Sequence, residues 1–359
     1  MKSTYNFNAG PAALPKAVLQ KAQQEFMNFD GTGMSVMELS HRSKEYERVQ
    51  DNASQLIKEL MNIPDTYEVL FMQGGASLQF SAIPLNFLPE GKIANYALTG
   101  SWSEKALKEA KKIGHTHIAS SSKDDNYCRI PQELELSNEP AYLHLTSNNT
   151  IFGTQWSKYP SLPADIPLIA DMSSDMLSRK IEIEDFSLLY AGAQKNLGPS
   201  GVTVVIIKKA LLEHCPPDIP TMLNYQTYAK NKSLYNTPPT FSIYMLSLVL
   251  EWVKENGGLA TLEKNNREKA SLLYETIDSS EGFYSGTSST ESRSSMNVTF
   301  RLQSEELITD FLQEAKEHGF VGLNGHRLVG GCRASIYNAV PLDSCYALAE
   351  FMKKYQSKY

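Results

Sequence analysis

One lysine in the middle of the chain, Lys195, is placed where its amine could act as a nucleophile. It lies in the segment AGAQKNLGPSG, between the apolar runs Leu188–Ala191 and Val202–Ile207, which have the length and composition of buried strands. A rigid strand end can desolvate an amine, which lowers its pKa and makes it reactive toward a carbonyl. Most lysines are exposed, so the alternative is an ordinary solvated loop lysine.

An acid precedes this lysine by 24 residues. The short apolar run Pro167–Asp171 ends in Asp171, and the interval up to Lys195 is long enough for a crossover to a neighbouring strand. A lysine that forms a Schiff base and an acid that keeps a pyridine nitrogen protonated are the groups with which enzymes use pyridoxal phosphate. Asp171 and Lys195 alone do not establish a pyridoxal phosphate site, because many strands end in an acidic residue.

The segment QGGAS, residues 73–77, indicates an anion site. It follows the predicted strand Tyr67–Met72 and precedes the predicted helix Leu78–Phe87. Glycines let backbone N–H groups approach a ligand, and the start of a helix favours negative charge, so phosphate is the natural ligand. The alternative is a turn that only joins a strand to a helix.

Other predicted strands are also followed by aromatic or polar residues. Trp102 follows Lys92–Leu98, and the polar cluster of residues 146–150, which includes Thr150, follows Ala141–Leu145. The tryptophan either packs in a core or offers its face to an aromatic ring, and the cluster is either a solvated turn or a site wall. Alternating strands and helices predict a mainly parallel sheet, which binds ligands beyond the carboxyl ends of its strands.

Cationic side chains gather in two segments. His326, Arg327 and Arg333 lie within eight residues among four glycines, and His41 and Arg42 are the basic residues before the predicted helix Glu45–Met61. Arginine binds carboxylate and phosphate through two parallel hydrogen bonds. The alternative for such residues in turns is full solvation.

Two polar segments complete the candidates. In LYNTPPTF, two prolines restrict the backbone and leave Asn236 and Thr237 as hydrogen-bond donors, although a rigid linker is the simpler interpretation. The segment Ser285–Ser295 is low in apolar residues and is predicted to be an exposed loop before the strand Met296–Leu302.

Composition restricts the function classes. The chain has 359 residues, 42% hydrophobic and 21% charged, which suits a globular protein of about two domains. The net charge of -6 gives no support for nucleic-acid binding. Four scattered cysteines show no metal-binding spacing and suit a reducing compartment. Without a signal-peptide pattern or an apolar run of about 18 residues, we expect a cytoplasmic protein with no membrane, nucleic-acid or metal partner.

In their order along the chain, these segments resemble the phosphoserine aminotransferases, which are fold-type I, class V pyridoxal phosphate enzymes. The matching motifs are NFNAGPAALP, MELSHRSKEY, QGGASLQF, TGSW, ADMSSD, YAGAQKNLGPSG, YNTPPTFSIY, MNVTF and GHRLVGGCRASIYNA. The resemblance implies an α/β fold, with a large domain built on a mainly parallel seven-stranded sheet flanked by helices and a smaller C-terminal α/β domain. We expect an N-terminal arm at residues 1–15, the large domain at 16–256 and the small domain at 257–359.

The resemblance also implies a role for each candidate. Lys195 would carry the cofactor as an aldimine and Asp171 would pair with the pyridine nitrogen. Trp102 would stack on the ring, and Thr150 would bond its hydroxyl. The cofactor phosphate would be bound by Ala76, Ser77 and Gln194, together with Asn236 and Thr237 of a neighbouring subunit. The anionic groups of the substrates would be bound by His41, Arg42, His326, Arg327 and Arg333.

The implied reaction moves an amino group from L-glutamate to 3-phosphohydroxypyruvate in two half-reactions, giving O-phospho-L-serine for serine biosynthesis, in a homodimer. A second activity on 3-hydroxy-2-oxo-4-phosphonooxybutanoate, in vitamin B6 synthesis, is left open. One rival is a related enzyme with an unphosphorylated substrate, such as a serine–glyoxylate aminotransferase or a cysteine desulfurase. The other is a binding module that keeps the fold without catalysis.

Overall fold

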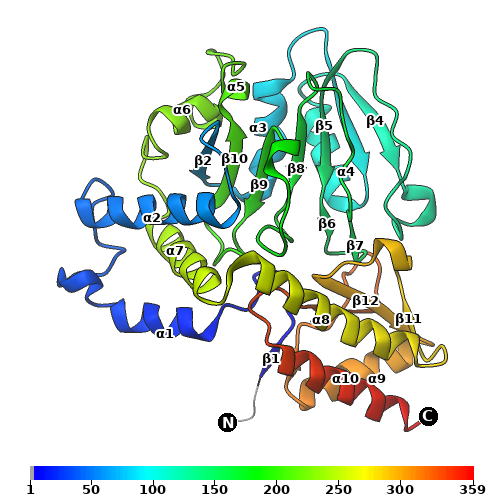
Figure 1. Cartoon of the computed structure of the whole chain (residues 1–359). Helices are drawn as coiled ribbons and strands as arrows, with labels where there is room; N and C mark the ends of the chain where they lie inside the picture. Colours follow the sequence, from blue (N-terminus) through cyan, green and yellow to red (C-terminus); the bar gives the residue numbers. More distant parts are fainter. Residues whose placement is uncertain (1–3) are drawn as a thin grey trace.

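A seven-stranded sheet forms the centre of the larger part of the molecule (Figure 1). The computed structural model describes residues 4–359. The strand order is β2 (Tyr67–Met72), β10 (Thr203–Lys208), β9 (Leu188–Gly192), β8 (Leu168–Asp171), β5 (Pro140–Thr146), β3 (Ile93–Leu98) and β4 (Thr116–Ser121). Among these described strands, β10 runs opposite to the other six, which share one direction, so the predicted mainly parallel sheet is confirmed.

Both faces of this sheet are buried, because successive side chains of a strand point to opposite sides. In β10, Val204 and Ile206 belong to one apolar core, whereas Val205 and Ile207 belong to another. The first core includes residues of α1 (Lys16–Glu25), α2 (Lys44–Leu60) and α7 (Thr240–Glu255). The second includes residues of α3 (Gly75–Phe87), α4 (Ser101–Ala110), α5 (Lys209–Leu212) and α6 (Tyr225–Lys230). The strands are therefore rigid supports for whatever follows their ends.

A smaller three-stranded antiparallel sheet carries the C-terminal part (Figure 1). Its order is β11 (Tyr284–Gly286), β12 (Asn297–Leu302) and β14 (Cys332–Ser335), and its core includes residues of α8 (Gly258–Asp278), α9 (Glu305–Glu317) and α10 (Leu342–Gln356). Two short pairs complete the strands: β1 (Tyr5–Asn6) with β13 (Phe320–Val321), and β6 (Asn148–Asn149) with β7 (Thr154–Gln155).

The two parts meet along α8. Leu259 and Leu262, in its first turns, belong to a core of the large sheet, whereas Leu273 and Ile277 belong to the core of the small sheet. Phe7 of the N-terminal segment is fully buried in that small core. The division into residues 1–15, 16–256 and 257–359 stays a prediction.

The expectation of an exposed loop at Ser285–Ser295 is wrong for much of that segment. Its start belongs to β11, and Ser288, Ser292 and Ser294 are buried. The Ser294 backbone N–H donates to the Gly153 carbonyl at 2.9 Å, and its hydroxyl donates to the side chain of Asn148. Low apolar content did not mean exposure, because hydrogen bonds satisfy the buried polar groups. Strand β4, at the polar edge of the large sheet, was not predicted.

A buried lysine of α8, Lys269, holds the turn between β14 and α10. Its side chain is 2% exposed and donates to the carbonyls of Ile336 (3.0 Å), Tyr337 (2.8 Å) and Val340 (3.1 Å). Burial lowers the pKa of Lys269 to about 8. The Tyr337 carbonyl also accepts from the Val340 N–H at 2.9 Å, whereas Lys269 is the donor to the Ile336 and Val340 carbonyls. Because buried carbonyls depend on this amine, the contact is costly to remove.

We predict that Lys269→Met lowers the free energy of unfolding by roughly 2–4 kcal/mol at neutral pH, because the Ile336 and Val340 carbonyls lose their donor. The folded-state pKa lies below the ordinary 10.5, so the unfolded state binds more protons between these values and the wild type gains stability as pH rises through this window. The loss caused by the variant therefore grows from pH 8 to 10.5. Chemical denaturation checks this, with the exposed Lys264→Met as control; equal stability of the two variants would contradict it.

Candidate active site

A cavity of about 420 Å³ at the carboxyl ends of the parallel strands brings together nine of the predicted site residues. They are Ala76, Ser77, Trp102, Thr150, Asp171, Gln194, Lys195, His326 and Arg333. The last residue of β8 and the segments after β2, β3, β5 and β9 supply the large-sheet residues, whereas Arg333 belongs to β14. Residues from both sheets therefore surround one space.

Lys195 is held by a tight turn after β9. The N–H groups of Lys195 and Gly198 both donate to the Ala193 carbonyl, at 2.7 and 2.9 Å. The amine is enclosed although the side chain keeps some exposure through the open cavity, and burial lowers the pKa of Lys195 to about 8. Nearby Asp171 opposes this by stabilising the ammonium, whereas Arg333 lowers the pKa further. The result is an amine that loses its proton at a lower pH than an ordinary lysine does.

Asp171 ends β8, the strand parallel to β9, and is 5% exposed. Its pKa is raised by burial, while hydrogen bonding to Ser173 and the charge of Lys195 oppose the rise. The Ser173 N–H donates to the Asp171 carboxylate at 2.9 Å. Ser147 donates its N–H and its hydroxyl to the Asp171 carbonyl, both at 3.0 Å. These bonds fix the carboxyl group at the cavity wall.

The glycine turn before α3 forms a cradle for an anion. Gly74 has a φ of +83°, and a Cβ there would lie 2.6 Å from the Cβ of Leu78, so no other residue fits without displacement. Helix α3 begins at Gly75, and its first turn contains no acidic residue. The first N–H groups of a helix have no partner within it, and those of Ala76 and Ser77 belong to this first turn.

Trp102, Thr150 and Arg333 form a connected wall. The Trp102 indole N–H donates to the Thr150 hydroxyl at 3.2 Å, and Arg333 Nη1 donates to the Thr150 carbonyl at 2.8 Å. The Lys195 amine lies 5.9 Å from the centre of the Trp102 ring. Two buried polar atoms at this cavity, Arg333 Nε and Thr146 Oγ1, have no partner within the described chain. Buried groups of this kind normally have one, so they are free to bind a ligand.

Five predicted residues do not line this cavity. Arg327 lines an adjoining hollow together with His326 and Arg333. Thr237 is exposed, and its carbonyl accepts from Gln73, the residue before the glycine turn. The lining also leaves out Asn236, His41 and Arg42.

The structure adds cavity residues that the sequence reasoning did not propose as ligands. Ala9 and Gly10 come from the N-terminal segment, which was predicted only to be ordered, and a Cβ on Gly10 would lie 3.5 Å from the Lys195 side chain. Thr146 and Asn148 belong to the polar cluster after β5, for which a site wall was one of two interpretations. Ser173 and Ser174 follow Asp171; their small polar side chains were the only available signal.

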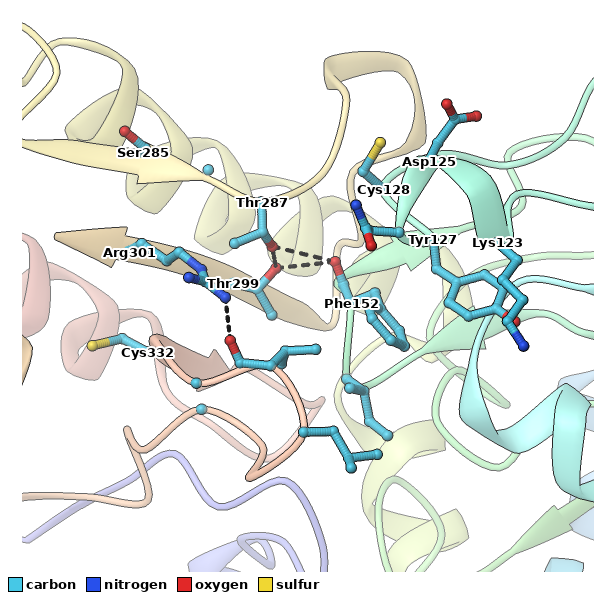
Figure 2. A pocket seen from close by; sticks show the side chains of 17 residues that line it. Lys123, Asp125, Tyr127, Cys128, Phe152, Ser285, Thr287, Thr299, Arg301 and Cys332 are labelled. Carbon is cyan, nitrogen blue, oxygen red and sulfur yellow. Dashed lines mark hydrogen bonds between the residues drawn. The ribbon is translucent and has the colours of Figure 1, made fainter. Parts of the chain in front are cut away.

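A larger cavity, of about 820 Å³, contains none of the predicted residues (Figure 2). It lies between the segment around Tyr127 and the small sheet, and Ile151 lines both cavities. Size alone would therefore select the wrong site, because the reactive lysine and acid border the smaller cavity. No group of metal-ligating side chains occurs among residues 4–359, and no helix in that range is long and apolar enough to cross a membrane.

Comparisons with known proteins agree with this geometry. The Aminotransferase class-V family matches residues 4–345. A phosphoserine aminotransferase of Geobacillus kaustophilus is 62% identical over the full length of both chains. A solved phosphoserine aminotransferase, studied for radiation damage of its Schiff base, has a TM-score of 0.99 at 60% identity with full coverage of both chains. The pyridoxal phosphate-bound enzyme of Trichomonas vaginalis has a TM-score of 0.93 at 39% identity, covering 98% of this chain and 100% of that one.

Fold and site thus define a fold-type I pyridoxal phosphate-dependent aminotransferase, and the predicted fold class, cofactor and enzyme class are confirmed. The chain belongs to the class-V aminotransferase family and, within it, to the phosphoserine aminotransferases. The residues present fit the cofactor: the glycine cradle suits its phosphate, Asp171 its pyridine nitrogen and the enclosed Lys195 its carbonyl carbon.

We predict that cofactor-free protein takes up pyridoxal phosphate covalently at a rate that rises with pH around 8, where Lys195 loses its proton. Asp171→Asn removes a charge that stabilises the ammonium and should lower this midpoint by roughly one pH unit. Absorbance after rapid mixing measures the rate, and Lys195→Ala is the control without covalent uptake. A midpoint near 10.5 would mean that the amine is not desolvated.

Proposed function

We propose that this protein transfers the amino group of L-glutamate to 3-phosphohydroxypyruvate, giving 2-oxoglutarate and O-phospho-L-serine in serine biosynthesis. The observation that carries the proposal is the full-length identity of about 60% to phosphoserine aminotransferases, together with the reactive lysine, acid and arginine around one cavity. The reaction proceeds in two half-reactions, because both substrates use the same space.

Each cofactor contact has a distinct task. Trp102 stacks on the ring, the Thr150 hydroxyl binds the ring hydroxyl, and Ala76, Ser77 and Gln194 bind the phosphate at the start of α3. The Asp171 carboxylate accepts a hydrogen bond from the pyridine N–H and keeps that nitrogen protonated. When bound, pyridoxal phosphate supplies an electrophilic carbonyl carbon and an electron-withdrawing ring.

Lys195 is the proton carrier. Its amine, with a pKa lowered to about 8 by burial, would take the proton from the Cα of the amino donor and give it to the cofactor carbon that receives the nitrogen. Its position at the end of a buried strand keeps the nitrogen near this atom throughout.

The substrates are held through their negative charges. Arg333 binds the carboxylate that both substrates share, with two parallel hydrogen bonds. His326, Arg327, His41 and Arg42 bind the phosphate of the keto acid and the side-chain carboxylate of glutamate. This local positive charge attracts anions although the whole chain carries -6.

The functional unit is a homodimer in which Asn236 and Thr237 of one subunit reach the cofactor phosphate of the other. This assignment agrees with the absence of both residues from the cavity lining of the single chain.

We further propose an arm at residues 1–15, a large domain at 16–256 and a small domain at 257–359. We also propose a cytoplasmic location, which suits the four unpaired cysteines of the described chain. Cell fractionation tests the location. The second activity, in vitamin B6 synthesis, stays a prediction, and an assay with 3-hydroxy-2-oxo-4-phosphonooxybutanoate as substrate tests it.

We predict that glutamate removes the visible absorption band of the loaded wild-type protein and that 3-phosphohydroxypyruvate restores it. Lys195→Ala should abolish turnover, a loss of at least about 100-fold, because the proton carrier is absent. Lys264→Ala, an exposed lysine, is the matched control. Absorbance spectra and steady-state rates give both results.

The spectra also separate the rival functions. A band that is lost with glutamate and never restored would reject 3-phosphohydroxypyruvate and favour an enzyme with an unphosphorylated acceptor. A protein that never acquires the band, even with added cofactor, would be a binding module. Near-normal rates for Lys195→Ala would rule out the role assigned to this lysine.

The shared site predicts rescue in mixed dimers. Lys195→Ala and the double variant Asn236→Ala, Thr237→Ala should each be nearly inactive at low cofactor concentration. Co-expressed, half of the dimers are mixed and one of their two sites is intact, so activity should return to roughly a quarter of wild type. No rescue in dimers purified through two different tags would place Asn236 and Thr237 in their own subunit's site.

A further inference from the structure

The segment Gly325–Gly331, here the substrate loop, separates the active-site cavity from the larger one. His326 lines the active-site cavity, and Arg327 lines the hollow beside it. Leu328, Val329 and Gly330 instead line the larger cavity of Figure 2. The loop is thus a thin wall with the proposed phosphate ligands on one side and open space on the other.

The loop is a closed unit with few anchors of its own. Its two ends meet where the Gly325 N–H donates to the Gly331 carbonyl at 2.9 Å, and the Val329 and Gly330 N–H groups both donate to the His326 carbonyl at 2.9 Å. Leu328, at its tip, is 65% exposed and so contributes little apolar burial. Its position therefore depends on contacts from outside the loop.

Arg301 of β12 supplies such a contact (Figure 2). Its guanidinium donates to the carbonyl of Val329, at the loop tip. Its side-chain stem lies against the loop's other end, since a Cβ on Gly331 would come within 3.0 Å of Arg301 Cγ. One side chain therefore contacts both the tip and the base of the substrate loop.

The other eight arginines of the chain already have an assignment. Arg48, Arg129, Arg267 and Arg293 pair with carboxylates, and Arg179 donates to Trp156 and Tyr159 in a buried setting. Three more are proposed substrate ligands: Arg42, Arg327 and Arg333. Arg301 is exposed and has no carboxylate within 4.0 Å in the described chain, so its hydrogen bond to the Val329 carbonyl is the interaction that explains its placement.

We propose that Arg301 is a positioning residue for the phosphorylated substrate: it holds the substrate loop so that His326 and Arg327 face the phosphate. The proposal rests on the proposed function. Without this bond, the open cavity of about 820 Å³ behind the loop gives Val329 and Leu328 room to move away from the active site. The apparent affinity for the phosphorylated substrate then falls in proportion to the fraction of molecules that keep the loop in place.

We predict that Arg301→Met raises the KM for 3-phosphohydroxypyruvate about 5-fold, as expected for loss of one exposed charged hydrogen bond, with kcat within about 2-fold of wild type. The melting temperature should stay unchanged, because the side chain is exposed. Arg267→Met, which removes another exposed arginine that lines neither main cavity, is the matched control and should leave KM unchanged. An unchanged KM in Arg301→Met would overturn the proposal.

A double variant separates positioning from direct or general effects. Arg327→Ala alone should raise the same KM roughly 10- to 150-fold, as one charged hydrogen-bond partner is lost. Adding Arg301→Met should then raise KM by clearly less than the 5-fold that it causes alone, since one of the two groups that it positions is gone and only His326 remains. Additive effects would mean that Arg301 acts independently of the loop. A wild-type protein that does not use 3-phosphohydroxypyruvate would instead refute the proposed function.

Discussion

The close placement of a buried amine and a buried carboxyl group is the constraint on which the rest of the structure depends. Burial lowers the pKa of Lys195 and raises that of Asp171, so water exclusion pushes both groups toward their neutral forms while their mutual attraction opposes this. Removing charges from water is costly unless partners are fixed around them. Adjacent parallel strands meet this requirement, because Asp171 lies opposite Tyr190 and the turn after β9 returns the lysine to the same space.

The small sheet and the N-terminal segment complete that fixation. Asn196, next to the lysine, accepts a hydrogen bond from the Asn338 N–H at 3.0 Å and donates to the Met176 carbonyl at 3.1 Å. The Ala12 N–H donates to the Gln194 carbonyl at 2.9 Å. Lys269 secures the turn that contains Asn338. Segments far apart in the sequence therefore position the Lys195 amine. A substitution in the N-terminal segment or in the turn around Asn338 should alter the position of this amine.

The two main cavities show why donors matter more than volume. The active-site cavity has about half the volume of the larger one. It is nevertheless lined by the start of α3, by Lys195 with its lowered pKa, and by two buried polar atoms that have no partner in the described chain. The larger cavity borders the back of the substrate loop, where a single arginine bond sets the loop position. An open space beside a binding loop allows adjustment, whereas the chemistry requires the preorganised polar groups of the smaller space.

Local patterns of the sequence determined the elements and most of the chemistry. Short apolar runs located β8 and β9, and β-branched content located β10, because these features depend on neighbours along the chain. The glycine turn indicated an anion site for the same reason. The edge strand β4 escaped prediction because only one of its residues, Ala119, is buried and it contains no apolar run. The buried serines of residues 285–295 escaped prediction because distant hydrogen-bond partners decide their burial. Only the tertiary structure brought Gly10 against Lys195 and Arg301 against the substrate loop, because contacts across such separations leave no local pattern.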